Sequence, residues 1–101
     1  MGFWAFNTER PPLNDPRVRQ ALSLAIDHNT IMQAVYYGTG WAANSLLPPS
    51  SWAYDDNLPQ NKQNLAKARE LLNDVGLENG FNLDVWPMPV SRSYNPNARK
   101  M

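Results

Sequence analysis

The sequence has no cysteine, which excludes disulfide scaffolds and thiolate metal sites but leaves the compartment undecided. It has no charge excess either, because nine lysines and arginines balance nine aspartates and glutamates. Without a net positive field, nucleic acid is not an expected partner. No apolar run approaches membrane-spanning length, so we expect no direct membrane insertion. The start of the chain lacks the basic and apolar regions of a signal peptide, which we therefore expect to lie outside this chain.

Side chains that carry catalysis or bind metals are also scarce. His28 is the only histidine and has no cysteine nearby to share a metal or a proton, so we predict an ordinary surface residue. Asp55 and Asp56 are adjacent in a proline-bounded loop, where carboxylates are typically turn formers rather than a catalytic pair. The five glycines form no phosphate-binding loop. We therefore predict a protein that is not an enzyme and that has no metal and no cofactor.

The sequence does contain apolar surface to bury. Its 43% hydrophobic residues, with four tryptophans and only 18% charged residues, are typical of a packed globular segment. A chain of 101 residues has room for one small core at most. Because no basic groove accompanies the aromatic groups, we predict that they pack in this core rather than stack on bases. The aromatic residues concerned are Phe3, Trp4, Phe6, Tyr36, Tyr37 and Trp41.

Apolar residues at three- and four-residue steps predict three amphipathic helices. The first begins at Pro16, after the capping pair Asn14-Asp15, and ends near Asp27. The second is shorter, is capped by Asp27 or Asn29, and is closed by Gly38 in the left-handed conformation. The two helices are thus predicted to form a consecutive pair.

The third helix starts near Asn61 or Asn64 and stops at Gly76. Asn95-Pro96 repeats the signal of a cap followed by proline, so residues 97–101 are predicted to be the first turn of a further helix. Because a complete domain rarely ends one turn into a capped helix, we expect the chain to be part of a larger domain.

The remaining segments are predicted to be two short strands and one long loop. Residues 3–6 form an apolar run of strand length, and residues 81–85 alternate between apolar and polar side chains. The loop, residues 39–60, is rich in proline, and Trp52 and Tyr54 are predicted to pin it. The fold class is therefore α/β and helix-rich, with about three helices and two short strands.

Arg92 is the strongest candidate for a binding residue. It lies in the loop between the second predicted strand and the cap at Asn95-Pro96, and loops held by rigid elements are where ligands are often met. The guanidinium group offers a fork of donors that matches a carboxylate. From the chemistry alone, both an anion site and an ordinary surface charge remain open.

Several motifs occur in a fixed order along nearly the whole chain. They are Phe6-Asn7-Thr8, residues 11–22, Ala25-Ile26-Asp27, Tyr37-Gly38-Thr39-Gly40, Leu47-Pro48-Pro49, Trp52-Ala53-Tyr54 and residues 66–72. In this order they resemble the peptide-binding class of extracytoplasmic solute-binding proteins of ABC transporters. The last motif, residues 86–90 followed by Arg92 and residues 94–99, is similar to dipeptide-binding members of that class.

The resemblance implies a fold of two lobes joined by a hinge, the type II periplasmic-binding-protein-like fold. Residues 1–101 would form a single partial domain within the larger C-terminal lobe. In dipeptide-binding members the arginine at the position of Arg92 pairs with the ligand's α-carboxylate, and Tyr94 and Met88 are expected to line the same pocket. The aspartate that holds the α-amino group in these members has no counterpart in this chain.

The resemblance further implies a periplasmic or other extracytoplasmic protein that hands a dipeptide or short oligopeptide to the permease subunits of an ABC transporter. The ligand itself stays open, because related proteins take oligopeptides, antimicrobial peptides, haem or nickel complexes. A different hypothesis is a stand-alone helical interaction module that uses Trp41, Trp52 and Tyr54 as anchors for a protein partner. A small hydrolase would need a catalytic pair that these residues do not supply.

Overall fold

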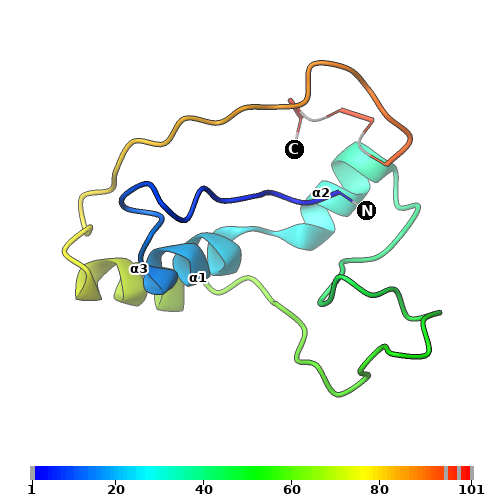
Figure 1. Cartoon of the computed structure of the whole chain (residues 1–101), viewed down its shortest axis with the longest axis horizontal. Coiled ribbons are helices and arrows are strands. Elements are labelled where there is room, and N and C mark those ends of the chain that lie inside the picture. Colours follow the sequence, from blue (N-terminus) through cyan, green and yellow to red (C-terminus); the bar gives the residue numbers. More distant parts are fainter. Residues whose placement is uncertain (1, 95, 98, 101) are drawn as a thin grey trace.

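The computed structural model describes residues 2–94, 96–97 and 99–100. Within these residues the chain forms three helices, joined and flanked by long irregular segments (Figure 1). They are α1 (Pro16–Ala25), α2 (His28–Tyr36) and α3 (Leu65–Asp74). The three predicted helices are therefore confirmed. None of the helices within the described ranges is long and apolar enough to cross a membrane.

Helix α1 begins at Pro16, as predicted from the capping residue followed by proline. The carboxylate of Asp15 accepts a hydrogen bond from the backbone N–H of Arg17 at 2.9 Å, and Pro16 fills the first helical position. The Arg17 guanidinium turns back and pairs with the same carboxylate, with 2.9 Å between Nη2 and Oδ2. These contacts, the Arg17 side-chain hydrogen bond foremost, lower the pKa of Asp15, and they raise the pKa of Arg17. The Arg17 guanidinium is thus already paired with the carboxylate that caps its own helix.

Helix α2 is capped by Asp27, not by Asn29. The Asp27 carboxylate accepts hydrogen bonds from the backbone N–H of Asn29 and of Thr30, and from the Thr30 hydroxyl at 2.6 Å. At the other end the chain turns into the left-handed region at Tyr37, with φ of 55°, and stays there at Gly38, with φ of 75°. The left-handed Gly38 is confirmed, but a tyrosine takes the first left-handed position.

Helix α3 is capped by Asn64, whose side chain accepts a hydrogen bond from the backbone N–H of Lys67 at 3.0 Å. The other candidate, Asn61, instead donates to the hydroxyl of Ser23 in α1. Gly76 has φ of 75°, as expected of a residue that stops a helix. The asparagine that lies immediately before the apolar stripe is therefore the one that starts the helix.

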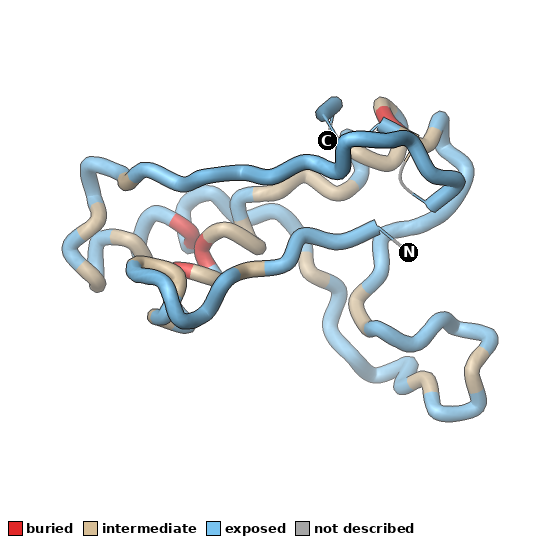
Figure 2. Tube along the Cα trace, turned by 45° about the horizontal axis from the view of Figure 1, so that its top comes forward, coloured by how far each residue is buried: buried red, intermediate tan, exposed pale blue. Residues whose placement is uncertain are grey.

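The core lies mainly between α1 and α3, which pack against each other. Val18 and Ala21 of α1 and Ala68 of α3 are buried there, and Val35 of α2 is buried separately (Figure 2). Alanines at the contact allow the two helix backbones to approach closely.

Hydrogen bonds from the segment before α3 tie it to the end of α1. The backbone N–H of Asn64 donates to the carbonyl of Leu24 at 2.8 Å, and the Gln63 side chain donates to the carbonyl of Ala25 at 3.0 Å. Both are carbonyls from the last turn of α1, which otherwise lack a helical partner.

The two predicted strands are wrong for this chain. Residues 3–6 and 81–85 are irregular, and within the described residues only Arg92 makes an isolated β-bridge. Val85 is 77% exposed and Trp86 is 90% exposed, although the alternating pattern predicts one buried face. A strand requires a neighbouring strand for its backbone hydrogen bonds, and no such neighbour lies beside either segment in the described part of the chain. An ion pair of 3.4 Å between Arg10 and Asp84 connects the second segment to the turn that follows the first.

The predicted aromatic core is wrong as well. Phe3, Trp4, Tyr37 and Trp41 are exposed, while Phe6 and Tyr36 are only partly buried. The physical reason is that the described residues form a single helix layer, whose narrow contact is filled by valine and alanine. Large rings require a second layer of structure to cover them.

The loop of residues 39–60 projects away from the helices and closes on itself (Figure 1). The Tyr54 hydroxyl donates to the Asn44 side chain at 2.9 Å, and the Asn44 amide donates to the carbonyl of Leu58 at 3.1 Å. The prediction that Tyr54 holds the loop in place is therefore confirmed. Trp52 is 98% exposed, so the same prediction for Trp52 is wrong. Asp55 accepts from the backbone N–H of Asn57, which confirms it as a turn former.

Acid is expected to weaken helix α2 through Asp27. Its pKa is lowered, first by the hydrogen bond from the Thr30 side chain and then by that from the Thr30 backbone. A depressed folded pKa stabilises the fold above the unfolded value of 3.8, and this stabilisation is lost as the pH falls through the lower folded value. Urea unfolding followed by circular dichroism at pH about 6 and about 3 measures the loss.

The matched control for this acid effect is Asp27→Asn, because asparagine keeps the cap but does not titrate. The difference in unfolding midpoint between the two pH values should be smaller in Asp27→Asn than in the unchanged chain. An equal difference in both proteins would show that Asp27 contributes nothing to the acid sensitivity.

Candidate functional site

The segment of residues 86–94 runs along the molecule as an extended chain and then turns beside the end of α2 (Figure 1). A hydrogen bond across the fold holds it there, from the Tyr36 hydroxyl to the carbonyl of Tyr94 at 2.9 Å. Helix α2 therefore positions the part of the chain in which the predicted binding residues lie.

Arg92 is exposed, and within the described residues its guanidinium makes no hydrogen bond or ion pair. No described residue uses the donors of this guanidinium. A carboxylate is the natural partner, because the guanidinium fork and the carboxylate fit each other through two parallel hydrogen bonds. The exposed position of Arg92 agrees with its predicted role in binding a carboxylate, and that role stays a prediction.

Met88 and Tyr94 lie close to each other, with 4.0 Å between the Tyr94 hydroxyl oxygen and the Met88 sulfur. Met88 is 37% exposed and Tyr94 is 47% exposed, so both side chains have surface left for a ligand. The structure therefore brings two of the three predicted site residues together. Their role in binding stays a prediction.

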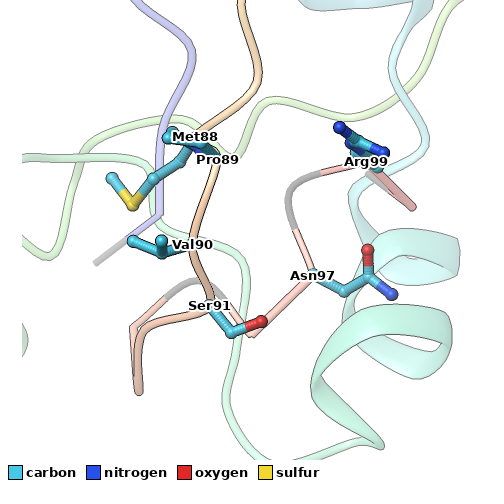
Figure 3. Close-up of a pocket in the computed structure, with 6 residues that line it drawn as sticks. All are labelled: Met88, Pro89, Val90, Ser91, Asn97 and Arg99. Atoms are coloured by element: carbon cyan, nitrogen blue, oxygen red, sulfur yellow. The ribbon is translucent and has the colours of Figure 1, made fainter.

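A small hollow lies between the extended segment and the turn that follows it (Figure 3). Its volume is about 90 Å³, and it is lined by Met88, Pro89, Val90, Ser91, Asn97 and Arg99. Met88 is the one predicted site residue that reaches it. Ser91, Asn97 and Arg99 were not predicted from the sequence. The available signal was the absence of any acidic residue after Asp84, which leaves the cations that follow without a nearby counter-charge.

The predicted helix start at Asn95-Pro96 falls largely outside the described residues, which omit Asn95, Ala98 and Met101. The described part is a turn, in which the backbone N–H of Lys100 donates to both the carbonyl and the side chain of Asn97, each at 3.1 Å.

His28 departs from the ordinary surface residue that was predicted. Its ring is partly buried, and its Nε2 atom is buried without a hydrogen-bond partner. Across the described part of the chain, no group of three or more histidine, cysteine, aspartate or glutamate side chains is placed to hold a metal ion.

The whole chain, residues 1–101, matches the family model of the middle part of bacterial extracellular solute-binding proteins, family 5. The chain belongs to this family. It is 46% identical over its full length to the dipeptide-binding protein of Escherichia coli, and 47% identical over 100 residues to the probable ABC transporter periplasmic-binding protein SapA of the same organism. It is also 43% identical to heme-binding protein A of Haemophilus influenzae.

The solved structures lead to the same family. One is the dipeptide-binding protein of Pseudoalteromonas sp. SM9913 in complex with Met-Leu, which is 56% identical and superposes with a TM-score of 0.89 over 96% of this chain. Another is HbpA2 of Haemophilus parasuis, with 45% identity and a TM-score of 0.86 over 92% of the chain. The chain spans only about a fifth of its relatives, 19% of the E. coli protein and 18% of SapA. These matches offer no support for a stand-alone interaction module.

Proposed function

We propose that residues 1–101 form part of the larger C-terminal lobe of a two-lobed extracytoplasmic protein that binds dipeptides or short oligopeptides. The observation that carries the proposal is the match over the whole chain to a family of solute-binding proteins, together with 56% identity to a protein crystallised with Met-Leu. The longer protein that this proposal requires is called the parent protein below.

In this proposal the chain contributes one wall of the binding site and one charge. Arg92 pairs with the carboxylate at the peptide's C-terminus, and Met88 and Tyr94 border the same site. The exposed and unpaired guanidinium of Arg92 supports this role. The carboxylate that holds the peptide's amino group comes from another part of the parent protein.

The parent protein acts by binding and release rather than by catalysis. It delivers its ligand to the permease subunits of an ABC transporter and works in the periplasm or its extracytoplasmic equivalent. The identity to relatives named as dipeptide-binding and periplasmic-binding proteins supports this assignment. Because a heme-binding protein is among the relatives, the peptide assignment needs a direct binding measurement.

The division of the site between two parts of the parent protein is testable by calorimetry. The parent protein is expected to bind Ala-Ala, whereas the 101-residue chain alone is expected to show no specific binding, because it holds only one of the two charges that clamp the ligand. D-Ala-D-Ala serves as the control ligand for specificity. Stereospecific binding by the chain alone would contradict the shared site, and absence of Ala-Ala binding by the parent protein would contradict the peptide assignment.

A further inference from the structure

The hollow beside the extended segment is polar and carries an unsatisfied positive charge. Arg99 lines it, and within the described residues the Arg99 guanidinium has no hydrogen bond and no ion pair. The three ion pairs among the described residues use Arg10, Arg17 and Lys67. Arg99 is therefore available to an anion from outside the chain.

The sequence around Arg99 contains no internal competitor for that anion. Residues 85–101 include Arg92, Arg99 and Lys100 but no aspartate or glutamate, so this stretch has three positive charges in a chain of net charge zero. Lys100 lies over the ring of Tyr37, with 6.0 Å between its Nζ atom and the ring centroid. The two arginines are thus the cations of this stretch that are left for a ligand.

Two further polar groups border the hollow. Figure 3 shows the Ser91 hydroxyl pointing from the extended segment toward the turn that carries Asn97 and Arg99. The side-chain oxygen of Asn97 accepts from the backbone N–H of Lys100, which leaves the Asn97 amide nitrogen as a donor. Figure 3 shows the Asn97 side chain directed away from the extended segment, so the Ser91 hydroxyl and the Arg99 guanidinium are the donors that the two sides of the hollow offer to a carboxylate.

The size of the hollow limits what it accepts. The hollow measures about 90 Å³ and is partly open to solvent, so it can surround only the end of a ligand. A carboxylate at the end of a side chain or of a peptide is a group of that kind. The hollow is also distinct from Arg92, which does not line it.

We propose that Arg99, with Ser91 across the hollow, forms a second carboxylate subsite of the binding protein, separate from the carboxylate contact at Arg92. This inference rests on the proposed peptide-binding function and adds a selectivity to it. The carboxylate that Arg99 accepts is either the side chain of an acidic residue in a dipeptide, whose C-terminus stays on Arg92, or the C-terminus of a longer peptide, which then reaches Arg99 instead of Arg92.

The test measures the affinity of the parent protein for Ala-Ala, Ala-Gln, Ala-Glu and Ala-Ala-Ala by calorimetry. Arg99→Gln is expected to weaken binding of a carboxylate-bearing ligand about tenfold or more, the usual loss for a charge-assisted contact, and to leave Ala-Ala and Ala-Gln unchanged. A selective loss for Ala-Glu identifies a side-chain carboxylate, and a selective loss for Ala-Ala-Ala identifies a peptide C-terminus. The matched control is Lys100→Gln, which removes the neighbouring positive charge and is expected to change none of the four affinities.

The proposal is overturned if Arg99→Gln changes all four affinities equally, if it changes none, or if Lys100→Gln has the same selective effect. The last outcome would indicate a general positive field rather than a subsite. Failure of the subsite is distinguishable from failure of the proposed function, because the latter requires that the unchanged parent protein does not bind Ala-Ala at all.

Discussion

Replacing Arg92 by alanine in the parent protein is expected to weaken Ala-Ala binding about tenfold to a hundredfold. A charge-assisted hydrogen bond to a carboxylate contributes roughly 1.5 to 3 kcal/mol when water is excluded, and each 1.4 kcal/mol is a factor of about ten in the dissociation constant. Arg92 has no partner among the described residues, so in the proposed site its replacement removes the contact with the peptide carboxylate and leaves no described group unpaired. Titration calorimetry measures the change directly.

Two variants separate the contact from general effects of charge. Arg69→Ala removes an exposed arginine from α3, far along the chain from the candidate site, and should leave the affinity unchanged. Arg92→Lys keeps the charge but loses the paired donors of the guanidinium, so its affinity should lie between those of the unchanged protein and Arg92→Ala. If Arg92→Ala binds Ala-Ala as tightly as the unchanged protein, the carboxylate assignment is wrong.

Placing an aspartate at Val18 is expected to destabilise the chain by about 3 to 5 kcal/mol, the usual consequence of an unpaired buried charge. Val18 is 0% exposed and lies at the contact between α1 and α3. The described core has only four buried side chains, so little other packing remains to offset the loss. Chemical denaturation of the chain followed by circular dichroism gives the free energy of unfolding.

Gln20→Asp is the control for this substitution, because Gln20 is on the same helix but is exposed. It introduces the same charge at a solvated position, where surface substitutions usually change stability by less than about 0.5 kcal/mol. Comparable losses for Val18→Asp and Gln20→Asp would mean that the contact between α1 and α3 does not hold the fold together.

The starts of all three helices were predictable because a helix cap is a local interaction. Asp15, Asp27 and Asn64 each bond a backbone N–H two or three residues along the chain, so the sequence neighbourhood contains both partners. The sequence alone left a choice at the second and third caps, since Asn29 and Asn61 have the same chemistry. The structure decides both in favour of the residue directly before the helix.

The two strand predictions were wrong because a strand depends on partners that are distant in the sequence. The alternation of apolar and polar side chains around Val85 indicates which face of a strand could be buried. The strand itself forms only when a distant segment supplies the backbone hydrogen bonds. Trp86 and Trp52 show the same limit for packing, since a large ring is buried only where a second layer meets it. Non-local partners of this kind cannot be read from a periodic pattern.

The candidate site was predictable in part. The sequence predicts Arg92 in a loop between a strand and a helix start; the structure shows Arg92 exposed in an irregular segment, but the strand predicted before it is absent. Its role came from the family resemblance, because a lone loop arginine is chemically ambiguous. Arg99 was not predicted as a site residue. It becomes a candidate only because the extended segment and the following turn lie side by side around one hollow, which the sequence does not show.

The hydrogen bond between Gln63 and Ala25 joins residues 38 positions apart and so closes a ring of chain that contains α2 and the projecting loop. The entropy cost of closing such a ring grows only with the logarithm of its length, by about 0.6 kcal/mol for each doubling. Insertions or deletions within the loop therefore change the stability of the α1–α3 contact very little.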